Sequence, residues 1–403
     1  MRPHVPPVPR GGAGGAGQLT VAFFTCNYRP LINGLSLAVE RLAAGLRARG
    51  HRVLIFAPRY AGARDPEPDC HRMPSLRVPT HHAYAVPLPW LGPRRRALLE
   101  ARPAIVHVHH PFVMGPYAAR LARRLGVPLV FTHHTLYEHY GHYLPAASAL
   151  AGTIARRRAA RFAGRADLVV APSPGVARQL AADGVRAPIL TIPTGVQAAP
   201  PPGREACAAR RRQLLGEAAG PLLLSVSRLA REKNLEPLLR AFALVANDGP
   251  GAALCLVGDG DDRARLARLA GSLGVAGRVR FAGAVAPEAV GGYYAAADIF
   301  AFPSVSEAQG LVVLEALAYC LPVLAARSPA VEDLLTDGVT ARLTEPTPAG
   351  LAAGLRELMA SPGLRARLGG AGRALAAQHP FDASVERHVQ AYRDLIRRAA
   401  PRE

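Results

Sequence analysis

The chain is 403 residues long, with 50% hydrophobic and 19% charged residues, a globular composition and a length that suits two α/β domains. Its formal net charge is +20, and its five scattered cysteines lack a CxxC spacing, so neither a disulfide framework nor a zinc ribbon is indicated. No stretch is apolar enough for long enough to span a bilayer, and residues 1–17 lack the apolar core of a secretory signal. We therefore expect a cytoplasmic protein in a reducing compartment.

The positive charge is concentrated in the first half of the chain. Residues 1–197 hold 25 Lys and Arg against 8 Asp and Glu, whereas residues 198–403 hold 24 against 21, so the net charges are +17 and +3. The first half also holds 12 of the 14 histidines. A GC-rich coding bias explains why arginine replaces lysine almost everywhere, but it does not explain the asymmetry. We expect the first half to face an anionic surface; a solvated face that only keeps the protein soluble is the alternative.

The tail and the first half come first in chain order. Residues 1–17 are rich in Pro, Gly and Ala and are expected to form a flexible tail. Their GGAGGAG run precedes the first strand, whereas a phosphate-binding glycine loop follows one, so we do not interpret it as a dinucleotide site. Helices are expected from Asn33, as the capping residue, to Gly50, and at 117–125. Strands are expected at 20–24, 52–57, 104–109, 128–132, 166–171 and 189–192.

The segment QAAPPPG at residues 197–203 is the best domain boundary, and strand–helix alternation restarts after it. We predict a first domain at 18–197, a second at 198–380, and a C-terminal helix in 381–403 that packs back on the first. Strand–helix alternation predicts an α/β fold of two Rossmann-like, doubly wound parallel-sheet domains, which face each other across a ligand-binding cleft. Further strands are expected at 221–227, 253–258, 279–282, 299–302 and 322–325, and helices at 235–246, 263–273 and 311–319.

The sequence SEAQGLVVLEA at residues 306–316 is the strongest functional signal. It follows an apolar strand and opens a helix, with Glu307 on the loop and Glu315 about two turns further along. Backbone N–H groups at Gly310 and Leu311 then lie at a helix N-terminus, which suits a diphosphate, and the carboxylates can accept hydrogen bonds from sugar and ribose hydroxyls. Two solvated glutamates on an amphipathic helix are the alternative. The combination of strand, glycine and helix start favours a binding site.

A second signal, SRLAREKN at residues 227–234, also follows a strand. Arg228 and Lys233 can converge on two phosphates and neutralise the charge that grows on a leaving nucleotide. A basic surface pair at a strand end is the alternative. Lys233 is the only lysine of the chain, which argues weakly against chance placement.

Three further patterns are less specific. Gly34 lies at a strand-to-helix turn, where a small residue lets the backbone approach a phosphate. The histidines of HVHH (107–110) and HH (133–134) follow two strands and are capable of metal binding, but no carboxylate or cysteine motif accompanies them. We favour imidazoles that hold hydroxyl groups. The DGD sequence at 259–261 lies in a glycine turn after a strand, and we interpret it as a turn.

These motifs together resemble glycosyltransferase family 4, whose members have the two-domain GT-B architecture, and the resemblance covers most of the chain. The family's EX7E signature, R-x4-K pair and G-x-G turn match, in that order, Glu307 and Glu315, Arg228 and Lys233, and Gly258 and Gly260. The segments NYRPLINGLS, Phe131–Tyr143 and SEAQGLVVLEALA are similar to diacylglycerol glucosyltransferases and related glycolipid synthases.

The resemblance implies specific roles. His134 would contact the transferring sugar, Glu307 its hydroxyls, Glu315 the ribose, Gly34 a phosphate and the Val285 backbone the base. His134 and Glu307 are thus the catalytic candidates. The donor-binding candidates are Gly34, Arg228, Lys233, Gly258, Val285, Gly310, Leu311 and Glu315, and the acceptor-side candidates are His109, Tyr137 and Tyr140. Asn33 stands where the family usually has a first glycine, as in many lipid-acting relatives.

The implied reaction is a retaining transfer of a hexose, glucose first, from a nucleoside-diphosphate sugar to a membrane lipid such as diacylglycerol. Neither a metal nor another cofactor is expected, because Arg228, Lys233 and the helix N-terminus at Gly310 supply the electrostatic stabilisation. The expected partners are the nucleotide sugar, the lipid acceptor and an anionic membrane, with the enzyme peripheral on the inner face of the plasma membrane. Nucleic acid is not expected, because the basic strands lack interleaved aromatics. A GDP-mannose-dependent mannosyltransferase acting on a lipid such as phosphatidylinositol, and a nucleotide-sugar 2-epimerase, are the alternatives.

Overall fold

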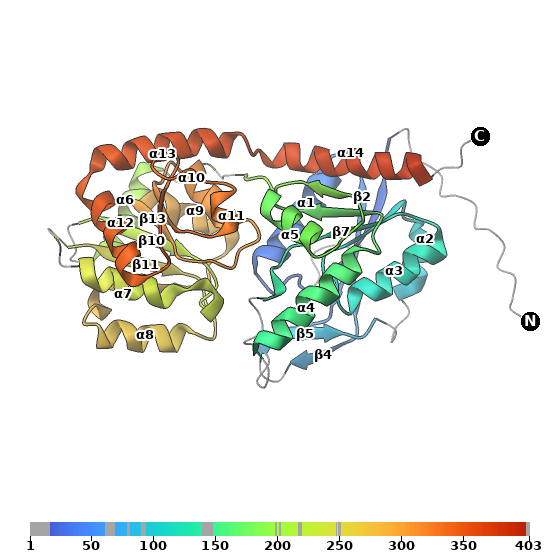
Figure 1. Ribbon diagram of the computed structural model, residues 1–403, viewed down its shortest axis with the longest axis horizontal. Helices are drawn as coiled ribbons and strands as arrows, with labels where there is room; N and C mark the ends of the chain where they lie inside the picture. Colours follow the sequence, from blue (N-terminus) through green and yellow to red (C-terminus); the bar gives the residue numbers. More distant parts are fainter. Residues whose placement is uncertain are drawn as a thin grey trace, which may run out of the picture. The chain divides into compact units, whose positions relative to one another are not determined.

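The structure is a computed structural model that describes residues 17–60, 69–78, 81–89, 94–138, 148–197, 200, 203–216, 220–246, 248 and 251–399. Its contacts divide the chain into two compact units, shown in Figure 1. Unit 1 comprises Met1–Pro193 and Asp382–Glu403, and unit 2 comprises Thr194–Phe381. The chain therefore enters unit 2 after Pro193, ahead of the proline run at 200–202, and leaves it after Phe381. The tail predicted at residues 1–17 lies outside the described residues except for Gly17.

Unit 1 is built on a seven-stranded parallel sheet in the order β3-β2-β1-β6-β7-β8-β9. Side chains of its central strands β1, β6 and β7 are buried on both faces, as in parallel sheets that helices cover on either side. The strands expected from the sequence in this half are all present. The bounds are β1 Thr20–Phe24, β2 Arg52–Pro58, β3 Cys70–Met73, β6 Ile105–Val108, β7 Leu129–Thr132, β8 Leu168–Ala171 and β9 Ile189–Thr191.

The helices of unit 1 begin and end at recognisable signals. Asn33 caps α1 through a capping box with Ser36, as the sequence predicts, and α3 ends at Gly126 in the left-handed conformation. An antiparallel hairpin of β4 (Ser75–Val78) and β5 (His81–Pro87) was not predicted, because that segment shows no clean apolar alternation. The helices are α1 Gly34–Ala48, α2 Arg94–Ala101, α3 Met114–Leu125, α4 Ser148–Ala163, α5 Pro174–Ala182 and α14 Phe381–Ala399.

The C-terminal helix α14 belongs to unit 1 from Asp382 onward. Its buried side includes His388 and Tyr392, and Arg49 donates to the Asp382 carboxylate at 2.8 Å near its start. Within the described ranges, no helix combines the length and the apolar character that crossing a bilayer requires.

Unit 2 repeats the architecture with a six-stranded parallel sheet in the order β12-β11-β10-β13-β14-β15. In both sheets the order reverses beside the first strand, between β1 and β6 in unit 1 and between β10 and β13 in unit 2. Ligands of such sheets bind outside the carboxyl ends of the strands at this switch point. The bounds are β10 Leu222–Val226, β11 Ala253–Val257, β12 Val279–Gly283, β13 Ile299–Phe302, β14 Val323–Ala326 and β15 Arg342–Thr344.

The core of unit 2 lies on the two faces of this sheet. Leu223 and Leu254 pack with α7, α8 and α12 on one face, while Leu224 and Phe300 pack with α9 and α10 on the other. Both faces are therefore covered, which explains why these strands read as continuous apolar runs in the sequence. The helices are α6 Arg204–Leu215, α7 Leu235–Val245, α8 Arg263–Ser272, α9 Pro287–Ala296, α10 Leu311–Ala318, α11 Pro329–Glu332, α12 Pro348–Ala360 and α13 Pro362–Ala377.

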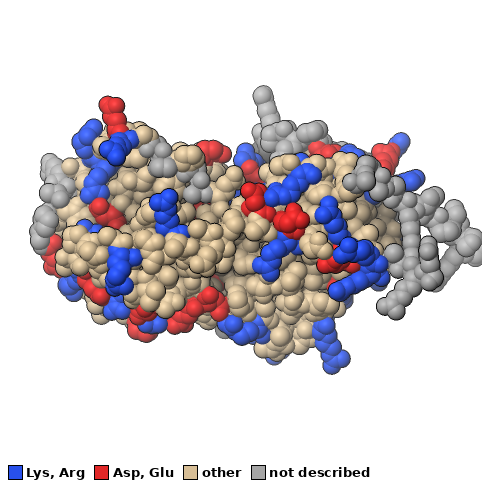
Figure 2. Space-filling view, turned by 90° about the horizontal axis from the view of Figure 1, so that it is seen from above, with Lys and Arg blue, Asp and Glu red and all other residues tan. Residues whose placement is uncertain are grey.

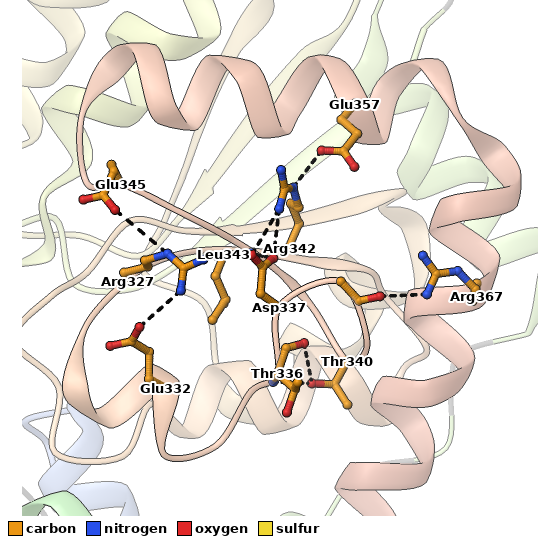
Figure 3. A network of polar contacts seen from close by, with 11 residues as sticks. Arg327, Glu332, Thr336, Asp337, Thr340, Arg342, Leu343, Glu345, Glu357 and Arg367 are labelled. Atoms are coloured by element: carbon orange, nitrogen blue, oxygen red, sulfur yellow. Dashed lines mark hydrogen bonds and ion pairs between the residues drawn. The ribbon is translucent and has the colours of Figure 1, made fainter.

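A polar network fastens the edge of the unit 2 sheet at β14 and β15 (Figure 3). The Asp337 carboxylate accepts hydrogen bonds from Arg327 at 2.8 Å, from Arg342 at 3.1 Å and from the Leu343 amide at 2.9 Å. Burial acts to raise the pKa of Asp337, but these hydrogen bonds and the two guanidinium charges outweigh it, so its pKa is lowered. The network ties strands and connecting loops together and involves none of the residues singled out from the sequence.

Candidate functional site

The switch point of unit 2 brings the two strongest sequence motifs together. Lys233 follows β10 and Glu307 follows the neighbouring strand β13, and the Lys233 ammonium donates to Glu307 Oε1 at 2.6 Å. The side chains are 14% and 21% exposed, so the pair is shielded yet still reaches the surface of the unit. The two motifs were identified independently, 74 residues apart, and the fold makes them one site.

Glu307 is held in its charged form. The same Oε1 also accepts a hydrogen bond from Ser304 at 2.9 Å. Burial alone would raise the pKa of Glu307, but the charge and hydrogen bond of Lys233, the Ser304 hydroxyl and the charge of Arg228 outweigh it, so its pKa is lowered. The carboxylate therefore acts as a hydrogen-bond acceptor at neutral pH, not as an acid.

Arg228 is positioned by an ion pair and by two glycines. Its guanidinium pairs with Glu232, whose side chain is only 1% exposed. A Cβ at Gly258 would overlap the carbonyl oxygen of Ser227, and one at Gly260 would overlap that of Leu229. The G-x-G turn thus lets the loop after β11 lie directly against the Arg228 loop, and Gly258 acts through backbone packing.

The N-terminus of α10 forms a third side of the site. Gly310 is the N-cap of α10 with φ at +75°, a conformation that favours glycine, and as a glycine it offers no side chain to cap the first turn. The amides from Leu311 onward are therefore at the uncapped, positive end of the helix. Glu315, about one turn into α10, accepts a hydrogen bond from Tyr294 at 3.0 Å. Val285 follows β12 and is partly buried against the same core.

Two cross-links that the sequence motifs did not reveal hold these loops in register. Asn234, in the left-handed conformation, donates from Nδ2 to the Pro303 carbonyl at 3.0 Å. The buried Ser306 hydroxyl donates to the Glu232 carbonyl at 2.8 Å. Both residues lie inside the motifs already singled out, so their position beside charged site residues was the only available signal.

The switch point of unit 1 is lined by histidines instead of charges. His107 lies on β6. Its Nδ1 is 2.7 Å from the Tyr392 hydroxyl on α14, and its Nε2 is 2.7 Å from the Thr132 hydroxyl on β7. His109 follows β6, and its Nδ1 lies 3.0 Å from Nε2 of His134, which follows β7. The two histidine motifs thus meet through one imidazole–imidazole hydrogen bond.

These histidines are neutral at physiological pH. Desolvation by burial lowers the pKa of His134 to about 3 and places those of His107 and His109 well below the usual range, with mutual repulsion adding to it. His109 is 1% exposed and packs its ring edge-on against Phe23 at 4.7 Å. Its Nδ1 is engaged by His134, while its buried Nε2 has no hydrogen-bond partner among the described residues, so the acceptor-side role of His109 stays a prediction.

The remaining candidates of unit 1 are less fully defined. Tyr137 is 7% exposed and packs its ring against Phe112 and His133. Tyr140 lies outside the described residues. Gly34 is the first residue of α1, and a Cβ there would meet nothing within 4 Å, so packing within unit 1 does not require glycine at this position.

The two patterns capable of metal binding have other bonding in the structure. Asp259 accepts a hydrogen bond from the Gly260 amide at 2.8 Å and pairs with Arg263, as expected of a turn. The histidines bond to one another and to hydroxyls, as described above. Across the described part of the chain, no group of three His, Cys, Asp or Glu side chains is arranged to hold a metal ion.

Comparison with known proteins covers both halves of the chain. Residues 32–199 match the family model described as Glycosyltransferase Family 4, and residues 209–375 match that of Glycosyl transferases group 1. An alpha-monoglucosyldiacylglycerol synthase of Streptococcus pneumoniae is 31% identical over 79% of this chain and 74% of that protein. A GDP-mannose-dependent alpha-(1-6)-phosphatidylinositol monomannoside mannosyltransferase of Mycolicibacterium smegmatis is 29% identical over 87% and 91%. The solved structure of sucrose-phosphate synthase from Thermosynechococcus elongatus shares the fold, with a TM-score of 0.78 at 22% identity over 94% of this chain and 100% of that chain.

Proposed function

Because the chain belongs to glycosyltransferase family 4 and is a glycosyltransferase of GT-B architecture, we propose that it transfers a hexose from a nucleoside-diphosphate sugar to a membrane lipid. Glucose from UDP-glucose onto diacylglycerol is the leading pair, and the transfer is retaining. The observation that carries the proposal is the Lys233–Glu307 pair beside Arg228 and the uncapped N-terminus of α10.

The chemistry of this site suits a sugar diphosphate. Arg228 and Lys233 provide two fixed cations, and the N–H groups at the start of α10 add the positive end of a helix. Charge that develops on the leaving diphosphate would therefore be stabilised without solvent reorganisation. Glu307 and Glu315 are acceptors for hydroxyl groups, Glu307 for those of the sugar and Glu315 for those of the ribose.

The lipid acceptor is supported by the relatives and by the neutral site of unit 1. The two relatives described above are named for lipids, one an alpha-monoglucosyldiacylglycerol synthase and the other a phosphatidylinositol monomannoside mannosyltransferase. The uncharged imidazoles at the switch point of unit 1 suit a hydroxyl group, since hydroxyls donate and accept with neutral histidine. We assign His134 to the transferring sugar and Tyr137 to the acceptor side.

A surface for an anionic membrane is available on α4. Leu150 and Ile154 are 64% and 42% exposed, and Arg157, Arg158 and Arg161 are exposed at positions that continue the same helical face. Apolar residues followed by arginines on one face suit insertion beside anionic headgroups. The other cluster, Arg94–Arg96, is less clear: the Arg96 guanidinium pairs with Glu100, and the neighbouring Trp90 and Leu91 lie outside the described residues.

The face of unit 1 that carries α14 is a poorer candidate. There, basic and acidic side chains of the described residues are interspersed among neutral ones (Figure 2). Arg156 lies next to the exposed face of α4 but is not counted as part of the docking surface, because its guanidinium forms a bidentate pair with Asp183. We therefore place the membrane-docking surface on α4.

A donor and acceptor screen tests the proposed reaction. UDP-glucose and GDP-mannose are incubated with the full chain and with liposomes that contain diacylglycerol or phosphatidylinositol. Formation of an α-glucosyl lipid, with the anomeric configuration read by NMR, is the expected result. Formation of an α-mannosyl lipid from GDP-mannose would show that the proposed donor and acceptor are wrong but that the proposed class of reaction is right.

The second candidate, a nucleotide-sugar 2-epimerase, shares the fold but needs no lipid. Conversion of the nucleotide sugar to its 2-epimer in the absence of liposomes would favour it and would contradict the proposal. Absence of any turnover with either donor, on every lipid, would contradict both.

A further inference from the structure

The chain passes between the two units twice. Hydrogen bonds hold each connection to its unit within one or two residues of the point where the chain crosses. In the first connection, the Ile192 amide donates to the Ala171 carbonyl of unit 1 at 2.9 Å. Two residues later, the Thr194 amide donates to Oε1 of Gln309 in unit 2 at 3.0 Å. Only Pro193 lies between these two bonds, so rotation in this connection is confined to a very short segment.

The second connection is fastened in the same way. The Phe381 amide donates to the Val196 carbonyl of unit 2 at 3.2 Å, and Asp382 accepts hydrogen bonds from Arg49 of unit 1. Val196 in turn donates to the His379 carbonyl at 2.9 Å. A Cβ at Gly195 would overlap the backbone of Phe381, so this residue must be small for the two connections to lie side by side at the Val196–Pro380 bridge.

Gln309 links the first connection to the loop at 306–310, called here the donor loop because the proposed function places the nucleotide sugar there. Its amide forms two hydrogen bonds to the backbone of Thr194, since Nε2 donates to the Thr194 carbonyl at 2.9 Å while Oε1 accepts from the Thr194 amide. The contact spans 115 positions in the sequence. In the loop, Gln309 lies between Glu307, which accepts the hydrogen bond of Lys233, and Gly310, which is the N-cap of α10.

The paired geometry makes this contact specific. A side-chain amide can match the donor and the acceptor of one residue's backbone at the same time, which an acid or an alkyl side chain of the same size cannot do. Because such a bidentate contact fixes both distance and orientation, a shift of the loop at Glu307 or Gly310 must move Thr194 or break both bonds. Relative motion of two domains in one chain is the default expectation, and the proposed function places the donor at this loop.

We propose that Gln309 is a positioning residue that couples occupancy of the donor loop to rotation at the two connections, through its paired bonds to Thr194. The inference rests on the proposed function, because it takes the loop at 306–310 as the place where the nucleotide sugar binds. Without Gln309, the donor would still bind to Lys233 and Arg228, but its binding would no longer change the rotation at the two connections.

Hydrogen exchange of the full chain, with and without UDP or GDP, provides the test together with steady-state kinetics. Gln309→Leu removes both bonds to Thr194. Gln309→Glu keeps the acceptor but replaces the amide donor with a carboxylate oxygen, which is repelled by the Thr194 carbonyl. The matched control is Gln213→Leu, an exposed glutamine on α6 of the same unit. Thermal denaturation verifies that each variant is folded.

We expect the nucleotide to slow exchange at 189–197 and 379–382 in the natural chain and in Gln213→Leu. In Gln309→Leu the exchange at Thr194 rises about tenfold, as for the loss of a protected hydrogen bond, and in both Gln309 variants the nucleotide no longer slows it. The kcat falls about tenfold or more while KM for the donor changes less than about threefold, since the coupling acts after binding.

The outcomes separate this inference from the proposed function. If Gln309→Leu matches Gln213→Leu in both exchange and kcat, or if nucleotide leaves exchange at the connections unchanged in the natural chain, the coupling is wrong while the donor site stands. If the natural chain binds neither UDP nor GDP, the proposed function fails and the coupling fails with it.

Discussion

The two switch points of this molecule have the same strand topology but opposite chemistry. In unit 2, the loops after β10 and β13 place Arg228, Lys233 and Glu307 together as charged, mutually bonded side chains. In unit 1, the loops after β6 and β7 place His109 and His134 together as neutral rings that share one hydrogen bond. The fold thus supplies the location, whereas the side chains decide whether a charged or an uncharged ligand suits it.

The comparison also separates the net charge from the site chemistry. Residues 1–197 carry +17, yet the histidine cluster at the switch point of unit 1 is neutral, and the exposed arginines of that half include Arg157, Arg158 and Arg161 on α4. The basic character therefore belongs to the exterior of unit 1. A charge count alone would have placed it at the binding site.

The largest expected effect comes from breaking the charged pair of unit 2. Glu307→Ala and Lys233→Ala should each lower kcat by about 100- to 1000-fold, the range observed when a fixed group that stabilises transition-state charge is removed. Transfer assays with the donor identified in the screen measure this loss. Unchanged circular dichroism shows that the fold is intact.

Two further variants sharpen that prediction. Glu307→Gln keeps a hydrogen-bonding oxygen near Ser304 but removes the charge that Lys233 neutralises. Arg240→Ala, which breaks an exposed ion pair with Glu236 on α7, is the control and should leave kcat within about twofold. Near-normal transfer by Glu307→Ala or Lys233→Ala would remove that residue from the site.

How far the sequence predicts the molecule differs between these regions. The strands, the capping of α1 by Asn33 and the placement of Arg228, Lys233, Glu307 and Gly310 at strand ends follow from local periodicity and short motifs. These features depend on neighbours in sequence, which is why pattern reasoning reaches them.

The features that were missed depend on partners far apart in sequence. The contact of Gln309 with Thr194 spans 115 positions, and that of His107 with Tyr392 spans 285. No local pattern distinguishes Gln309 as a backbone-binding residue, or His109 as a buried partner of His134. The burial of His109 could not be read from the sequence, which shows only its place at a strand end.

The second prediction uses the buried histidines to separate the units by pH. Burial lowers the pKa of His110, His133 and His388 to about 4 and that of His134 to about 3. Below about pH 6.5 the unfolded chain takes up protons that the folded chain does not, so the free energy of unfolding falls as pH falls, by about 1.4 kcal/mol per pH unit for each such histidine.

Unit 2 should lack most of this dependence, because residues 194–381 contain a single histidine, His379. Urea unfolding between pH 7.5 and pH 5 is the measurement. Hydrogen exchange of β6 reports on unit 1, and that of β10 reports on unit 2. We expect the unit 1 transition to move to lower urea concentration as the pH falls, more steeply than that of unit 2. Equal slopes in the two units would show that these histidines are not held neutral.

The third prediction tests the assignment of the exterior charge to a membrane. The change Arg157→Ser, Arg158→Ser and Arg161→Ser should weaken binding to anionic vesicles by at least tenfold, since each basic residue near such a surface contributes about 1 kcal/mol. Binding should rise with the anionic lipid fraction and fall with salt, because the Debye length is about 8 Å at physiological ionic strength. Co-sedimentation with phosphatidylglycerol-containing and neutral liposomes measures it.

A charge-matched control keeps the interpretation specific. Arg204→Ser, Arg212→Ser and Arg268→Ser remove the same charge from exposed positions of unit 2 and should change binding less than about twofold. Leu150→Ser with Ile154→Ser should weaken binding even at high salt, because insertion of apolar side chains is not screened. Equal partitioning of the natural chain onto neutral and anionic vesicles would contradict the membrane assignment.

The smallest expected effect is that of metal removal, and it tests whether the charges of unit 2 suffice. Lys233 and Arg228 place two cations beside the uncapped start of α10, which is the charge complement that a divalent ion would otherwise supply to a diphosphate. Asp259 of the DGD turn is already engaged by Gly260 and Arg263, and the histidines of unit 1 hydrogen-bond to one another and to hydroxyls. We therefore expect kcat to stay within about twofold after dialysis against EDTA and 1,10-phenanthroline, with the chelators removed before assay.

Lys233→Ala provides the informative contrast: if added Mg²⁺ partly restores that variant but leaves the natural chain unchanged, the lysine performs the electrostatic role of a metal. Loss of turnover in the natural chain on chelation, with recovery on adding a divalent ion, would instead show that the reaction depends on a metal.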